Sequence, residues 1–253
     1  MSNFYSNNIK QRLSLREPLA QALDVMAKLV EWLDFKNRPS DGEAYAAFLE
    51  EQLCRVKEVC PACKNFERDF PSFAFSIATG IGKTRLMGAC IAYLYLAKGI
   101  KHFFILAPNL TLYEKLMKDF GDPSYEKYVF RGISEFVHNE PYIITGDNYD
   151  MARSLFAENQ IQINIFNISK FNTESKEGSK KGTPRMRRLS EYLGQSYFDY
   201  LSSLDDLVIL MDEAHRYHAD ASKKAINELR PILGLEMTAT PTDERQTVQE
   251  HCL

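Results

Sequence analysis

The sequence predicts an α/β fold in which a mostly parallel sheet is flanked by helices. Short apolar runs that are typical of buried strands alternate with longer segments whose apolar residues recur at helical spacing. A glycine-bearing turn joins the first of these strands directly to a helix. Ligands of such sheets gather at the carboxyl ends of the strands, so functional residues are expected there.

The composition is that of a globular protein with a real core. The 253 residues, 45% hydrophobic and 26% charged, allow one large domain or two small ones. The net charge of −3 gives no overall attraction to nucleic acid, so any such binding must depend on local patches. No apolar run approaches the roughly twenty residues that cross a bilayer. The polar N-terminus and the odd number of cysteines predict a cytoplasmic protein without a membrane partner.

An N-terminal helical segment, residues 1–70, is expected to pack on the core. Residues 1–14 are polar and predict a loose lead-in. Apolar residues at helical spacing predict one helix over Leu15–Leu33 and a second over about Glu43–Glu58. Both helices are expected to cover the sheet that follows.

Two cysteines precede the first strand in the sequence Cys60-Pro61-Ala62-Cys63. A structural zinc site usually takes four ligands from two such pairs, and the sequence has no second pair. A plain connecting loop is therefore favoured over a metal site.

The stretch ATGIGKT, residues 78–84, follows the apolar run Phe73–Ile77 and opens a helix. Its glycines let backbone N–H groups point at phosphate oxygens, and the helix N-terminus adds the positive end of its dipole. Lys83 would reach the terminal phosphates of a nucleotide, and the Thr84 hydroxyl would bind Mg²⁺. An ordinary turn is the alternative, because the strict pattern has glycine where Ile77 stands. The predicted nucleotide-binding residues are Thr79, Gly80, Ile81, Gly82, Lys83, Thr84 and Arg85.

The nucleotide-binding lobe is expected to span residues 71–253. Further strands are predicted at 101–106, 141–145, 161–168, 207–211 and 235–237, with helices near 111–120, 189–201 and 220–230. A basic, glycine-containing stretch at 172–188 interrupts this alternation. It is interpreted as a flexible surface loop, which is either a solvated insertion or a phosphate-contacting segment.

Two acids follow the most apolar strand, in the tetrapeptide Asp212-Glu213-Ala214-His215. A nucleotide hydrolase needs such acids opposite its phosphate loop. Asp212 would hold Mg²⁺, and Glu213 would orient and deprotonate the attacking water. The last predicted strand ends in the hydroxyl residues Thr238 and Thr240.

In this order, ATGIGKT, DEAH and TAT resemble motifs I, II and III of the superfamily 2 helicases. The segments LVILMDEAHRYHADASKKAINELRPILGLEMTATP, IFNISKFN and LAPNLTLYEKL are similar to the Res subunits of type III restriction–modification enzymes. The resemblance extends over about Leu15–Pro241. It implies a RecA-like P-loop NTPase lobe, ATP and Mg²⁺ as ligands, and double-stranded DNA as the track.

The resemblance also implies roles for individual residues. Lys83, Asp212, Glu213 and His215 would be catalytic. His215 together with Thr238 and Thr240 would couple the ATP site to the nucleic-acid face. Contacts to the DNA backbone are implied for Pro108, Asn109, Thr145, Gly146, Ser169 and Lys170.

The chain departs from its relatives near the N-terminus, where a glutamine often reads adenine in the pattern Arg-x-Pro-Gln. Here Leu19 follows Arg16-Glu17-Pro18, and Gln21 comes two residues later. Either Gln21 reads adenine from the next helical position, or base selectivity is relaxed.

A second departure lies at the other end, where twelve residues follow Pro241 in the chain of 253. Another RecA-like lobe needs roughly 100–200 residues. The second lobe, with its arginine finger, and the nuclease domain are therefore expected to be absent from this chain. The expected partners, besides DNA, are a second RecA-like lobe and a modification or nuclease partner.

The leading interpretation is thus the ATP-binding motor lobe of a DEAH-box DNA helicase or translocase of the type III restriction kind. A non-catalytic interaction module that docks on a partner lobe is an alternative, and an RNA helicase lobe is another, because it shares every ATP motif.

Overall fold

The computed structural model describes residues 2–40, 42–61, 63–149, 160–168, 185–187, 195–213 and 220–239. Within them, one six-stranded sheet has the order β1-β6-β5-β2-β4-β3, and every neighbouring pair is parallel. This confirms the predicted α/β fold. The strands are β1 Ser72–Ser76, β2 His102–Ala107, β3 Tyr142–Thr145, β4 Gln162–Asn167, β5 Leu207–Asp212 and β6 Leu233–Thr238.

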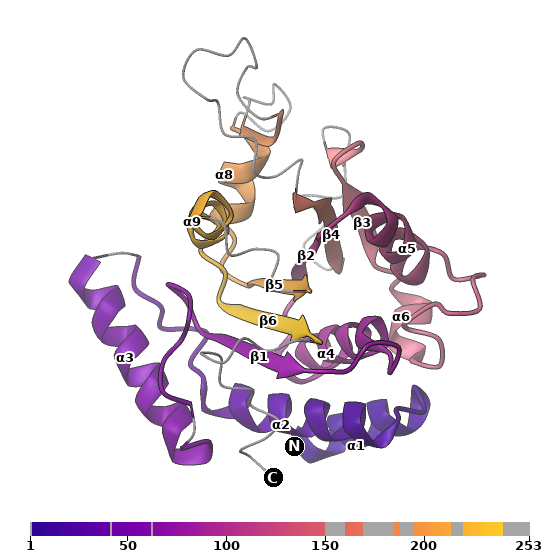
Figure 1. Cartoon of the computed structure of the whole chain (residues 1–253), viewed down its shortest axis with the longest axis horizontal. Helices are drawn as coiled ribbons and strands as arrows, with labels where there is room; N and C mark the ends of the chain where they lie inside the picture. The colour runs from indigo at the N-terminus through magenta and orange to yellow at the C-terminus, as the bar shows by residue number, and fades with distance from the viewer. Residues whose placement is uncertain are drawn as a thin grey trace.

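Helices connect and cover these strands (Figure 1). None of the described helices is long and apolar enough to cross a membrane. The α-helices are α1 Ser2–Arg12, α2 Glu17–Trp32, α3 Gly42–Val59, α4 Lys83–Lys98, α5 Leu110–Gly121, α6 Ser134–His138, α8 Tyr197–Ser202 and α9 Asp220–Glu228, and a short 3₁₀ helix covers Arg185–Arg187.

Both faces of the sheet are buried. Successive side chains of each strand point to opposite sides, and each side joins a core of its own. In β2, Phe103 and Ile105 join a core that includes residues of α1, α2, α4 and α5. Phe104 and Leu106 join a second core, with residues of α8 and α9. Figure 1 shows α1 and α2 on one side of the sheet and α8 and α9 on the other. The strands were predictable because two buried faces produce continuous apolar runs.

The expectation of a loose lead-in at residues 1–14 was wrong. Ser2–Arg12 forms helix α1, and Ser6, Ile9 and Leu13 are buried. These three positions recur at helical spacing, but they include only two large apolar side chains, so the pattern is weak. Packing against α2 and α4, rather than intrinsic amphipathicity, stabilises this helix.

The helix predicted over residues 189–201 also differs. The described part begins at Tyr197, because Ser196 has an extended backbone and its hydroxyl accepts a hydrogen bond from the Asp199 N–H. Residues 188–194 lie outside the described part of the chain, as does most of the predicted basic loop at 172–188. A serine at the N-cap position favours the start of a helix, because its side chain accepts a hydrogen bond from a backbone N–H of the first turn.

A buried ion pair fixes the entry to the sheet. Nε of Arg68, in the segment before β1, donates to Oε1 of Glu236 on β6 at 2.7 Å, and the two side chains are 4% and 2% exposed. Removing one member of such a pair leaves the other charge buried without that partner.

We predict that Arg68→Met lowers the free energy of unfolding by about 3–5 kcal/mol, the cost of breaking a buried ion pair from one side. Urea denaturation would measure it. The matched control is Arg55→Met, whose guanidinium pairs with Glu51 at the surface. That variant should change stability by no more than about 1 kcal/mol. Equal effects of the two substitutions would contradict the prediction.

Candidate nucleotide-binding site

Strand β6 lies between β1 and β5. Its carbonyl groups accept hydrogen bonds from the segments that follow these two strands. The N–H of Ile77, just after β1, donates to the Thr238 carbonyl at 2.8 Å. The N–H of Glu213, just after β5, donates to the Met237 carbonyl at 2.8 Å. The glycine-containing loop and the two acids therefore start at the same level of the carboxyl edge, although over 120 residues separate them in the sequence.

The loop after β1 depends on glycine. Gly80 has φ +79° and Gly82 has φ +123°, values that other residues rarely adopt. A Cβ on Gly82 would also lie 3.2 Å from Cδ1 of Leu19 on α2. Gly82 then serves as the N-cap of α4, and its carbonyl accepts hydrogen bonds from the N–H groups of Arg85 and Leu86. The turn thus leads into the helix N-terminus, as the sequence predicted.

Lys83, the first residue of α4, faces both acids that follow β5. Its Nζ forms an ion pair with Glu213 Oε1 and lies 3.8 Å from Asp212 Oδ1. Glu213 has φ +52°, an uncommon value for a residue with a side chain. Backbone strain of this kind is typical of functional sites, where surrounding contacts impose it.

Asp212 is 3% exposed, and burial raises the pKa of its carboxyl. The positive charge of Lys83 acts in the opposite direction, as does Lys115, and the negative charge of Glu213 adds to the increase. Oδ1 of Asp212 is buried without a hydrogen-bond partner. Thr84, with a hydroxyl side chain that is also buried, begins the same helix. An unsatisfied carboxylate oxygen and a hydroxyl suit Mg²⁺, which takes one or two protein oxygens and keeps the rest for water and phosphate.

These residues line a cleft of about 650 Å³. The predicted nucleotide-binding residues from Thr79 to Arg85 all belong to its lining, with Asp212 and Glu213. Sequence reasoning missed the other members, which come from the N-terminal helices, α5 and the loop after it. They are Ser14, Arg16, Leu19, Leu112, Lys115, Asp119, Lys127 and Val129.

Comparison with known proteins identifies the family. Residues 35–243 match the family described as "Type III restriction enzyme, res subunit". The chain belongs to this family. Over 172 residues it is 28% identical to a protein from Haemophilus influenzae described as "Probable type III restriction-modification enzyme HindVIP Res subunit". That match covers 64% of this chain but only 29% of the relative's length.

The family assignment confirms the RecA-like lobe, because Res subunits carry a P-loop helicase domain. It also supports, in general terms, a nucleotide-binding hydrolase of the helicase type. The six-stranded parallel sheet, with the phosphate loop and the acid pair at one edge, is the framework that such a lobe requires.

Three of the other residues that line the cleft are charged: Lys115, Asp119 and Lys127. Lys115 Nζ lies 3.9 Å from Asp119 Oδ2, and Asp119 is 2% exposed. Burial raises the pKa of Asp119, and the two lysines oppose this increase. The i,i+4 spacing of Lys115 and Asp119 on α5 was a usable signal for a shared helix face. Lys127 lies in a loop and carried no such signal.

Gln21, the candidate adenine reader, does not line the cleft. Its Nε2 donates to Oε1 of Glu17, one helical turn earlier, at 3.0 Å. Arg16 and Leu19 of the same N-terminal region do line the cleft. Arg85 turns its Nε toward the Leu13 carbonyl at 2.9 Å, which links α4 to the end of α1.

Four of the six residues predicted to touch DNA lie at the carboxyl ends of β2 and β3, at the same edge of the sheet as the cleft. Asn109 is the N-cap of α5, and its Oδ1 accepts from the Leu112 N–H at 2.8 Å. Pro108 precedes it and is partly exposed. Thr145 is buried, and its N–H donates to Asn148 Oδ1 at 2.7 Å, while Gly146 is also buried. Ser169, Lys170, His215 and Thr240 lie outside the described residues, and Thr238 is fully buried.

Cys60 and Cys63, in the segment before β1, belong to the core on the side of the sheet that α1, α2 and α4 cover. Cys63 is buried, and its Sγ lies 3.9 Å from the Asn65 carbonyl. In the part of the chain that the structure describes, no group of three or more His, Cys, Asp or Glu side chains could hold a metal ion.

We predict that Asp119→Asn stabilises the ligand-free chain at pH 7. The raised pKa means that the folded state prefers the neutral carboxyl, so ionisation at neutral pH destabilises the fold. The gain in the free energy of unfolding should be complete at pH values above the folded-state pKa of Asp119, and it should disappear at pH values below the ordinary pKa of 3.8. Thermal unfolding of both proteins across this pH range would measure it.

Asp122→Asn is the matched control, with the opposite sign. Hydrogen bonds from the Ser124 hydroxyl and N–H lower the pKa of Asp122, so its carboxylate stabilises the fold above the ordinary value and loses that effect as pH falls through the folded value. This substitution should destabilise the chain at pH 7. Shifts of the same sign in both variants would contradict the assignment.

Proposed function

We propose that this chain is the ATP-binding motor lobe of a DNA helicase or translocase of the type III restriction kind. One observation carries the proposal: β6 aligns the two loops so that Lys83 contacts Glu213 and approaches Asp212. A phosphate-binding lysine, a buried carboxylate and a second carboxylate within reach are the parts that nucleotide hydrolysis needs.

In the proposed mechanism, the N–H groups of the glycine loop and the N-terminus of α4 hold the phosphates of ATP. Lys83 moves from Glu213 to the terminal phosphates, because they carry more negative charge than a carboxylate. This movement frees Glu213 to orient a water molecule and to accept its proton as the water attacks the γ-phosphate. The bond from the γ-phosphorus to the bridging oxygen breaks, and ADP leaves. Thr84 and Asp212 would hold Mg²⁺, which supplies positive charge to the phosphate oxygens.

Rapid turnover by this lobe is proposed to need a second lobe. In related phosphoryl transfer an arginine finger increases turnover about 10³–10⁵-fold. Arg16 and Arg85 are the arginines among the described residues that line the cleft. The side chain of Arg85 is hydrogen-bonded to the Leu13 carbonyl. We therefore propose that a second lobe supplies this arginine, that double-stranded DNA is the track, and that a modification or nuclease partner completes the assembly.

We predict that the chain binds Mg²⁺–ATP but hydrolyses it slowly and neither unwinds nor cleaves DNA alone. Lys83→Ala should abolish ATP binding, because it removes the only charged side chain of the phosphate loop before Arg85. Glu213→Gln should retain binding and lose the residual turnover, because an amide cannot accept the proton. Calorimetry and steady-state phosphate release, with and without duplex DNA, would measure both.

Lys28→Ala, an exposed lysine of α2 outside the cleft, is the matched control and should bind ATP like the unmodified chain. Rapid DNA-stimulated hydrolysis by the unmodified chain, abolished in Glu213→Gln, would contradict the need for a second lobe. Absence of ATP binding in the unmodified chain would overturn the proposed function itself.

We also propose that base selectivity is relaxed, because Gln21 is bonded to Glu17 and does not line the cleft. Gln21→Ala should therefore leave the ratio of ATP to GTP affinity unchanged, to within about twofold. Competition binding with the two nucleotides would measure this ratio. A loss of ATP preference in the variant would show that Gln21 reads adenine after all.

A further inference from the structure

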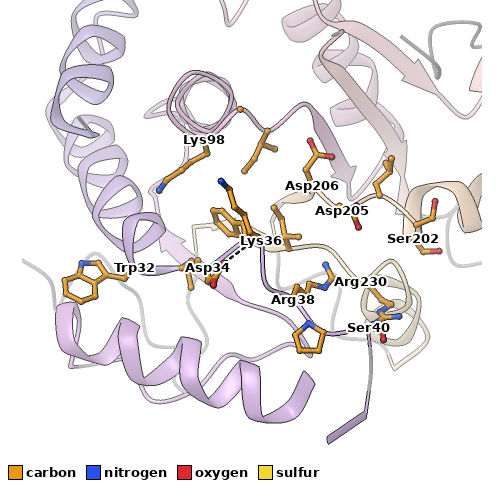
Figure 2. A pocket seen from close by; sticks show the side chains of 18 of the residues that line it. Trp32, Asp34, Lys36, Arg38, Ser40, Lys98, Ser202, Asp205, Asp206 and Arg230 are labelled. Carbon is orange, nitrogen blue, oxygen red and sulfur yellow. Dashed lines mark hydrogen bonds between the residues drawn. The ribbon is translucent and has the colours of Figure 1, made fainter. Parts of the chain in front are cut away.

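A second cavity, of about 900 Å³, lies at the opposite edge of the sheet from the nucleotide cleft. Part of its wall is formed by the residues just before β2, β5 and β6, in the segments 98–100, 202–206 and 230–232. The remainder comes from the end of α2, the segment that follows it, and Arg55 of α3. Its volume is in the range of cavities that hold small ligands. Figure 2 shows this pocket.

Four basic side chains line this wall in addition to Arg55. Lys36, Arg38, Lys98 and Arg230 line the pocket, and none of them forms an ion pair within the described part of the chain. In Figure 2 these side chains surround the same space, and they come from three separate segments. Arg55, the remaining cation of the wall, is paired with Glu51.

Two acids of the same wall are already occupied. Asp34 accepts hydrogen bonds from the Lys36 N–H at 2.9 Å and from the Asn37 side chain at 2.7 Å. Asp206 accepts from the Lys101 N–H at 2.8 Å and pairs with His102. Glu31 and Asp205 are the other acids of the wall, so five basic side chains face four acidic ones, and the net positive charge favours an anionic ligand.

Arg38 and Arg230 are close enough to repel each other. Burial lowers the pKa of Arg38, and the charge of Arg230 lowers it further, while Tyr45 and Asp205 oppose the change. Arg38 lies over the Tyr45 ring, at 5.7 Å from its centroid, and the Tyr45 hydroxyl donates to the Asp69 carbonyl at 2.9 Å. Arginine stays charged in proteins, so two positive charges meet at this part of the pocket, with Asp205 as the nearby acid.

The backbone of Arg230 gives an independent indication. It has φ +51° and follows the end of α9 at the position where helices most often have glycine. Its N–H donates to the Asn227 carbonyl at 2.9 Å, which closes the helix end. Glycine would adopt this conformation without strain, so arginine here reduces stability and places a guanidinium at the pocket.

We propose that this pocket binds a phosphate group of a larger anionic ligand, between Arg38 and Arg230, with Lys36 and Lys98 adding positive charge. Guanidinium groups bind phosphate oxygens in a bidentate manner. A dianion neutralises both arginines, whereas a single carboxylate leaves one of them uncompensated. The site is separate from the nucleotide cleft and does not depend on ATP hydrolysis.

The test uses inorganic pyrophosphate as the probe and the Lys83→Ala chain as the background, which removes the lysine of the phosphate loop. Calorimetry should show saturable binding of about one pyrophosphate per chain. The double variant Arg38→Gln/Arg230→Gln should weaken this binding at least tenfold. The control Lys28→Gln/Lys57→Gln removes two exposed charges outside the pocket and should leave the affinity within about twofold. Equal affinities in both double variants, or no saturable binding, would overturn the proposal.

Arg230→Gly separates loss of the site from loss of the fold. Glycine relieves the strained backbone, so the melting temperature should rise while pyrophosphate binding weakens several-fold. A variant that is more stable and still binds pyrophosphate with full affinity would overturn the role of Arg230.

Competition then identifies the source of the phosphate. Displacement of pyrophosphate by a short duplex DNA would indicate the nucleic-acid backbone, whereas displacement by a nucleoside monophosphate alone would indicate a small phosphate ester. Both displacements should disappear in Arg38→Gln/Arg230→Gln. Competition that survives in this variant would place the displaced pyrophosphate elsewhere and overturn the proposal.

Discussion

The hydrogen bonds that β6 makes to both of its neighbours determine the relative level of the glycine loop after β1 and the two acids after β5. Thr238 and Met237 offer adjacent carbonyls, one to the N–H of Ile77 and the other to the N–H of Glu213. Because strand register moves in whole residues, a one-residue shift in the pairing of β6 with only one of these neighbours would displace the glycine loop from the acids. The approach of Lys83 to Asp212 and Glu213 therefore depends on backbone hydrogen bonds of β6, a strand that contributes none of these three side chains.

Charged side chains of both signs gather at both edges of the sheet. At the carboxyl edge, Lys83 is paired with Glu213, so charges of opposite sign meet inside the protein. At the amino edge, Arg38 and Arg230 bring like charges together. The same strands β2, β5 and β6 contribute to both edges. A parallel sheet makes this possible, since all its strand ends of one kind lie on one side.

Sequence reasoning succeeded where a single short segment carried the signal. Strands buried on both faces appear as apolar runs, and the glycines of the loop after β1 are required by their positive φ angles. It failed for α1, where only Ile9 and Leu13 supply large apolar side chains. It could not find the second pocket, because that wall combines distant segments whose charges become significant only after folding. Likewise, no pattern indicated that Lys127 would share the nucleotide cleft with Asp119.

The pairing of Lys83 with Glu213 has a consequence for ligand choice. A ligand that enters the cleft must compete with a carboxylate for the ammonium group, and it must do so beside the negative charge of Asp212. Uncharged nucleosides cannot offer that competition, and a ligand with several phosphate charges can. The ammonium group of Lys83 is thus already neutralised by Glu213, and this part of the cleft favours a ligand by its charge before its shape matters.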